Sequence, residues 1–123
     1  MFDQKDELNT KNEYRILKQQ FITGVSNRLS RLWVIYNELM LVEKDDFSST
    51  LELLHYELHK LTGAAGIYGF PSLEYHSRKL EKEVWSSINV NKDVSDLKIL
   101  MKKYYIELVH IEKEYHKLME GYD

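Results

Sequence analysis

The residues of this sequence best suited to chemistry are its five histidines, because the chain contains no cysteine. Histidine titrates near neutral pH, so its imidazole can act as a nucleophile, a proton carrier or a metal ligand. The lack of cysteine excludes a disulfide framework, a thiolate zinc site, an iron–sulfur cluster and a cysteine nucleophile.

His59 has the most unusual surroundings, because Gly63 follows it one helical turn later. Residues 49–68 predict a helix whose inward stripe is Leu51, Leu54, Leu58, Leu61 and Ala65. At 100° per residue, His59 lies about 120° and Gly63 about 160° from the centre of that stripe. An outward glycine costs a helix about 1 kcal/mol relative to alanine and suggests a place where another protein's reactive group comes close. The alternative, close helix packing, suits Ala64, Ala65 and Gly66.

Residues 58–69, Leu-His-Lys-Leu-Thr-Gly-Ala-Ala-Gly-Ile-Tyr-Gly, resemble the signature of the histidine-containing phosphotransfer (HPt) domain. By this resemblance His59 matches the phosphoacceptor. The other matching positions are the core residue Leu61, Gly63, the small pair Ala64 and Ala65, the turn residue Gly69 and the later pair Leu80-Glu81. The strong part of the resemblance covers about a quarter of the chain.

The resemblance implies a phosphocarrier of a two-component multistep phosphorelay, with a phosphohistidine at His59. The expected partners are response-regulator receiver domains and a hybrid sensor histidine kinase. We expect no cofactor in this chain, because the receiver would supply Mg²⁺ and a lysine. No Gly-x-x-x-x-Gly-Lys-Ser/Thr loop occurs, so we expect no ATP site, no autokinase activity and no other enzyme activity. The expected docking and supporting residues are His55, Lys60, Thr62, Gly63 and Gly66.

One position departs from the family pattern. The family usually has a lysine three residues after the histidine, where this chain has Thr62. Lys60 lies about 100° around the helix from His59 and cannot simply replace it. We expect a basic residue of a neighbouring helix to lie near His59 and to offset the missing charge. The candidates are Arg28, Arg31, Arg78, Lys79 and Lys82.

Two other functions compete with this interpretation. Glu52-x-x-His55 and Glu107-x-x-His110 have the spacing of di-iron bundle ligands, but the wheels place Glu52 and His110 about 140° from their core stripes. Both pairs are thus predicted to face outward, and no metal site is expected. His55 and His59 have a zinc-capable spacing without an obvious third ligand. His76, His110 and His116 are predicted to be ordinary surface or boundary residues. The second alternative is a helical adaptor that binds receivers without phosphotransfer, which Thr62 alone favours.

The elements that position these residues are predicted to be helices throughout. Apolar residues recur at helical spacing, and three of the five glycines and the only proline fall within residues 63–71. The fold class is therefore all-α, an antiparallel up-down four-helix bundle. Thr23-Gly24 predicts a possible short extra N-terminal helix. Ser48 or Ser49 is expected to cap the second helix, Pro71 to begin the third and residues 88–92 to form a loop.

Two long stripes define the first and last helices. The first is Tyr14, Phe21, Val25, Leu29, Leu32, Tyr36 and Leu39, and the last is Leu97, Met101, Tyr104, Leu108, Ile111, Tyr115 and Leu118. Residues 1–123 are expected to form a single domain, with residues 1–10 loosely ordered.

Net charge and hydropathy narrow the possible functions and partners further. With 20 acidic and 17 basic residues, the formal net charge is −3, which argues against a nucleic-acid partner. No apolar run approaches the length of a membrane span, and the first residues have no apolar signal core. A cytoplasmic domain without membrane insertion is expected.

Overall fold

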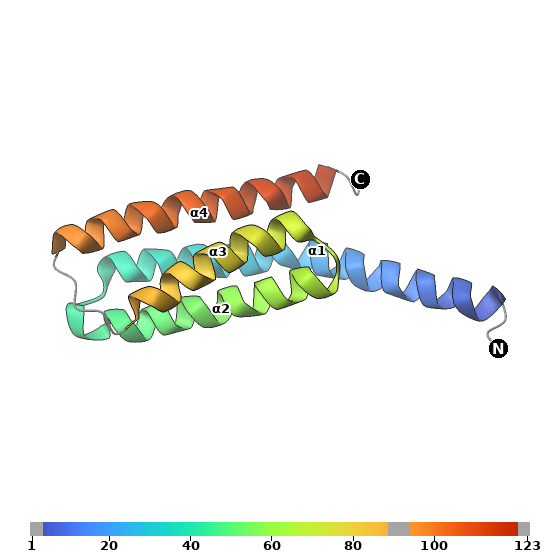
Figure 1. Cartoon of the computed structure of the whole chain (residues 1–123), viewed down its shortest axis with the longest axis horizontal. Helices are drawn as coiled ribbons and strands as arrows, with labels where there is room; N and C mark the ends of the chain where they lie inside the picture. Colours follow the sequence, from blue (N-terminus) through green and yellow to red (C-terminus); the bar gives the residue numbers. More distant parts are fainter. Residues whose placement is uncertain (1–3, 89–93, 121–123) are drawn as a thin grey trace.

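The computed structural model of the chain describes residues 4–88 and 94–120, and all its regular elements are helical. They are α1 (Gln4–Leu41), a 3-10 turn η1 (Lys44–Asp46), α2 (Phe47–Ile67), α3 (Pro71–Ser87) and α4 (Val94–Glu120). The helices alternate in direction along the chain (Figure 1). Within the described residues α1 packs on α2 and α4, and α3 packs on α2 and α4, so the four helices close into a ring. The predicted all-α four-helix bundle is confirmed.

The predicted apolar stripes form the core of this bundle. All five stripe residues of α2 are buried, as are the stripe positions of α1 from Phe21 to Leu39. On α4 the stripe is buried from Tyr104 to Tyr115, and its ends at Leu97, Met101 and Leu118 are half-buried. Burial of these faces against one another is what positions the four helices.

The N-terminal part of α1 differs from the prediction. α1 is one continuous helix, so Thr23-Gly24 does not separate a short leading helix. Its first turns extend past the other helices (Figure 1). Tyr14 contacts the end of α2, at Ile67 and Tyr68, and is 46% exposed instead of belonging to the core. The backbone of residues 4–10 is helical where a loosely ordered segment was expected, and residues 1–3 lie outside the described part. Buried Phe21, Ile22 and Val25 anchor the helix on both sides of Gly24.

The connections also differ in detail. Asp46, not Ser48 or Ser49, is the N-cap of α2, because the η1 turn leads directly into the helix. The Ser49 hydroxyl instead donates a hydrogen bond to the Asp46 carbonyl at 3.0 Å. Pro71 begins α3 as predicted, after a turn in which Gly69 has a φ of 75°. α3 continues to Ser87, and the predicted loop at 88–92 lies, apart from Ile88, outside the described residues.

None of the helices in the described part of the chain is long and apolar enough to cross a bilayer.

Candidate functional site

His59 lies on the outward face of α2, where its side chain is 71% exposed. Its Nδ1 atom lies 2.6 Å from Oε1 of Glu81, a residue of α3. An ionised carboxylate only accepts hydrogen bonds, so Nδ1 carries the proton that is donated to Glu81. In the neutral ring the lone pair then belongs to Nε2. The contact therefore fixes both the tautomer and the orientation of an exposed imidazole.

A shallow hollow lies beside this ring. It has a volume of about 340 Å³ and is lined by His55, His59, Glu81, Lys82 and Trp85. His55 Nε2 lies 3.6 Å from the same Glu81 oxygen, and the His55 ring packs against Trp85 at 4.9 Å between centroids. Glu81 is thus the side chain that connects the two histidines of α2 with α3. The sequence pattern includes Glu81 only as half of the Leu80-Glu81 pair and does not predict its contact with His59.

Gly63 lies in open space, as the helical wheel predicts. A Cβ atom built on this residue meets no other atom within 4 Å. Gly66 differs, because a Cβ there would lie 3.1 Å from the carboxylate of Glu74 on α3. Gly63 therefore leaves room for a partner beside His59, whereas Gly66 leaves room for a side chain of this chain.

Thr62 is buried, with 4% of its surface exposed, where α2 packs on α3. Its hydroxyl donates to the Leu58 carbonyl at 2.8 Å and lies 3.1 Å from the Ser77 hydroxyl. This position supports the packing of the two helices and does not present a side chain to a partner, which corrects its inclusion among docking residues. A lysine here would have to bring its charge into the interface.

The basic residues around His59 have separate roles. Lys82 is the one candidate that lines the hollow. Arg78 pairs with Glu74 at 2.6 Å, and Lys79 pairs with Glu107 of α4 at 3.1 Å. Lys60 and Arg31 both pair with the buried carboxylate of Glu57, at 3.2 and 3.0 Å. Among these candidates, the positive charge that borders the hollow is thus supplied by Lys82 of α3, five residues before that helix ends at Ser87.

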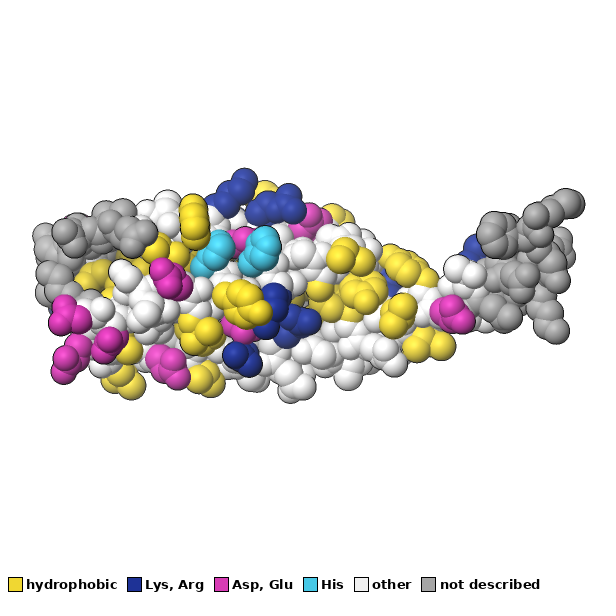
Figure 2. Space-filling view, turned by 90° about the horizontal axis from the view of Figure 1, so that it is seen from below, with side chains coloured by type: hydrophobic (Ala, Val, Ile, Leu, Met, Phe, Trp, Pro, Cys, Tyr) yellow, Lys and Arg dark blue, Asp and Glu magenta, His cyan; other side chains and the backbone are white. Residues whose placement is uncertain are grey.

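The exposed face of α2 also carries apolar side chains. Tyr56 and Ile67 on α2 and Trp85 on α3 are all more than half exposed. The ammonium of Lys60 lies over the Tyr56 ring, 4.6 Å from its centroid. Figure 2 shows two adjacent histidines on this face, with hydrophobic and basic side chains around them. Such a surface is suited to contact with another protein.

The two Glu-x-x-His pairs do not form a di-iron site. Glu52 is exposed on α2, and among the described residues α2 and α4 are not adjacent helices but face each other across the core. Glu107, however, is buried, so the prediction that its pair faces outward is wrong for this residue. It lies three residues after Tyr104 and four before Ile111, on the buried stripe itself, and Lys79 offsets its charge.

Comparisons of the chain with protein-family models, with curated proteins and with solved structures found no match. The resemblance to the HPt domain therefore stays a prediction from the sequence pattern.

Proposed function

We propose that this protein is a phosphocarrier that accepts a phosphoryl group on His59 Nε2 and passes it between receiver-domain aspartates. The observation that carries this proposal is the 2.6 Å contact of Nδ1 with Glu81 beneath an exposed ring. It leaves the second nitrogen as an oriented nucleophile at the surface.

The transfer step needs little from this chain beyond positioning. The Nε2 lone pair attacks phosphorus, the bond from phosphorus to the aspartyl oxygen breaks, and the receiver's carboxylate leaves with the electron pair. The ring becomes cationic as the nitrogen–phosphorus bond forms, and the Glu81 carboxylate stabilises that charge through Nδ1–H. Attack by a second receiver's carboxylate reverses these changes. Mg²⁺ and a lysine would come from the receiver, so no cofactor of this chain enters the step.

The surface around His59 can accept such a partner. Open space at Gly63 lets a carboxylate approach the ring to the near-attack distance of about 3 to 3.5 Å. Tyr56, Ile67 and Trp85 offer apolar contact area, and Lys82 offers positive charge beside the phosphoryl group. The proposed partners are receiver domains and a hybrid sensor kinase in the cytoplasm, with no nucleic acid involved. The buried position of Thr62 gives an adaptor without phosphotransfer no support of its own.

The test is phosphotransfer from phosphorylated receiver domains to the purified chain. We expect label on the chain that is labile in acid and stable in alkali, as a phosphoramidate is, and that is lost completely in His59→Gln. His55→Gln is the matched control, because His55 contacts the same carboxylate from the same helix, and it should retain labelling. Labelling that persists in His59→Gln, or that disappears in a folded His55→Gln variant alone, would overturn the assignment.

A further inference from the structure

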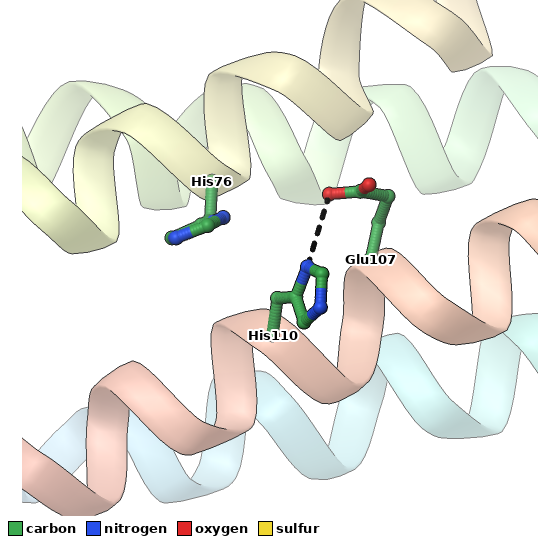
Figure 3. A group of neighbouring side chains, drawn as sticks. All are labelled: His76, Glu107 and His110. Carbon is green, nitrogen blue, oxygen red and sulfur yellow. Dashed lines mark ion pairs between the residues drawn. The ribbon is translucent and has the colours of Figure 1, made fainter.

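A second group of histidines lies between α3 and α4, away from the hollow at His59. His76 belongs to α3, and Glu107 and His110 belong to α4 (Figure 3). One potential ligand atom from each of the three residues lies within 4.8 Å of those of the other two. Glu107 and His110 are three residues apart, so both side chains project from one face of the helix. Two helices thus bring two imidazoles and a carboxylate together.

All three residues have buried polar atoms without a hydrogen-bond partner in the described part of the chain. These atoms are His76 Nδ1, Glu107 Oε2 and His110 Nδ1. His110 Nδ1 lies 3.8 Å from Glu107 Oε2, which is too long for a hydrogen bond. Buried polar groups are normally paired, because leaving them unpaired is costly. Each of the three residues thus contributes one buried polar atom without a hydrogen-bond partner in the described residues, and each offers a ligand atom within 4.8 Å of the other two.

Two further charged side chains lie near the remaining polar atoms of Glu107 and His76. Lys79 Nζ lies 3.1 Å from Glu107 Oε1, which leaves Oε2 directed at the histidines. Glu114 Oε1 lies 4.0 Å from His76 Nε2, on the opposite side of the ring from Nδ1. Carboxylates commonly orient metal-binding histidines through a hydrogen bond to the nitrogen that does not bind the metal, and Glu114 would have to come about 1 Å closer to His76 to form one. The hydrogen bond and charge of Glu107 also raise the pKa of Lys79, so this lysine stays cationic.

We propose that His76, Glu107 and His110 bind one Zn²⁺ ion between α3 and α4, with water as the fourth ligand. Two imidazoles, one carboxylate and a water form a common zinc coordination set. In a tetrahedral site, ligand atoms at about 2.0–2.2 Å from zinc lie about 3.3–3.6 Å apart. Atoms that are now up to 4.8 Å apart must therefore close by about 1.2–1.5 Å. The half-buried rings of His76 and His110 have the freedom to make that adjustment. The ion would tie α4 to α3 independently of His59.

The test is titration of the metal-free full chain with Zn²⁺ in competition with a chromophoric chelator, together with the visible spectrum of bound Co²⁺. We expect one ion per chain and a tetrahedral Co²⁺ spectrum. His76→Gln and His110→Gln should each weaken binding by about hundredfold or more, and Glu114→Gln by about tenfold to hundredfold. Circular dichroism of each variant checks that the helices are retained.

Two controls make this test specific. His116→Gln changes an exposed histidine of α4 outside the group and should leave the affinity unchanged. Lys79→Met removes the cation beside Glu107 and should tighten binding by about tenfold, because the carboxylate then interacts with the ion alone. Absence of stoichiometric binding would overturn the proposal. So would binding that survives His76→Gln and His110→Gln, or that is lost in His55→Gln or His59→Gln, since the ion would then lie in the other hollow.

Discussion

Two helix interfaces of this bundle each bring a glutamate to histidines, and they do so with opposite geometry. Between α2 and α3, Glu81 contacts Nδ1 of a ring that is largely exposed. Between α3 and α4, buried Glu107 Oε2 and Nδ1 of each neighbouring histidine have no hydrogen-bond partner within residues 4–88 and 94–120. A satisfied carboxylate beneath an exposed ring prepares the outer nitrogen to react with a partner. Unsatisfied atoms directed at one point are suited to holding a cation. The same two residue types therefore support different chemistry according to which atoms the packing leaves unpaired.

The largest expected effect concerns access of a partner to the exposed His59 ring. In Gly63→Gln a long side chain occupies the open space beside His59, so phosphotransfer from a receiver should fall by at least about hundredfold. The thermal unfolding midpoint should hold, because no buried volume changes. Zn²⁺ affinity at the α3–α4 interface should also hold, which keeps the two regions distinct.

A matched control is Gly24→Gln, since Gly24 is another helical glycine with open space around its Cβ position, on α1. It should leave phosphotransfer unchanged. Gly63→Ala should stabilise the domain by up to about 1 kcal/mol through helix propensity. If Gly63→Gln instead unfolds the chain, the glycine is packed against another helix and the docking surface is misplaced.

A smaller effect is expected when the carboxylate of the exposed region loses its charge. Glu81→Gln can still accept a hydrogen bond from His59 Nδ1, but it no longer stabilises a cationic ring, so the transfer rate should fall by about tenfold to hundredfold. The control is Glu52→Gln, which removes the charge of an exposed carboxylate on the same face of the bundle. Its transfer rate shows how much of the effect is due to loss of surface charge alone.

Glu81→Gln also tests whether the His59 region and the histidine group between α3 and α4 function independently. Glu81→Gln should leave Zn²⁺ binding intact, and Glu107→Gln should abolish Zn²⁺ binding and leave phosphotransfer intact. If either substitution affects both measurements in a folded protein, the two regions do not function separately.

The smallest expected effect concerns the packing of α2 on α3 beneath His59. Thr62→Val removes the hydroxyl that bonds to Leu58 and Ser77, so the free energy of unfolding should decrease by about 1 kcal/mol. Chemical denaturation measures this change. Phosphotransfer should remain at the unmodified rate, because Thr62 is buried and Ser77 keeps its bond to the Leu73 carbonyl. A loss of transfer at unchanged stability would return Thr62 to the docking residues.

Periodicity predicted the helices and their buried faces, because a stripe such as that of α2 has to pack against its neighbours. It failed at Tyr14, which lies beside Tyr68 and donates to the Ile67 carbonyl at the end of α2 but stays 46% exposed. It also failed at Glu107, because periodicity places a charged residue at the surface and cannot show that Lys79 of another helix pairs with it. The position of Glu107 between Tyr104 and Ile111 was the available signal.

The candidate site, like the fold, was predicted only where the geometry of a single helix determines it. The outward direction of His59 and the open space at Gly63 follow from the geometry of one helix, and both are confirmed. The contact of His59 with Glu81 depends on how far α3 is shifted along α2, which a single-helix pattern does not encode. The same is true of the meeting of His76 with His110.

The turn at Gly69 has a mechanical consequence for this alignment. Gly69 lies ten residues after His59 and twelve before Glu81, which correspond to helical arms of about 15 and 18 Å. A rotation of about 10° at the turn would displace Glu81 by about 3 Å, more than a hydrogen bond tolerates. The φ of 75° at this residue is one that glycine adopts without strain. The left-handed backbone conformation of Gly69 thus sets the angle between α2 and α3. That angle in turn sets the distance between the Glu81 carboxylate and the His59 ring.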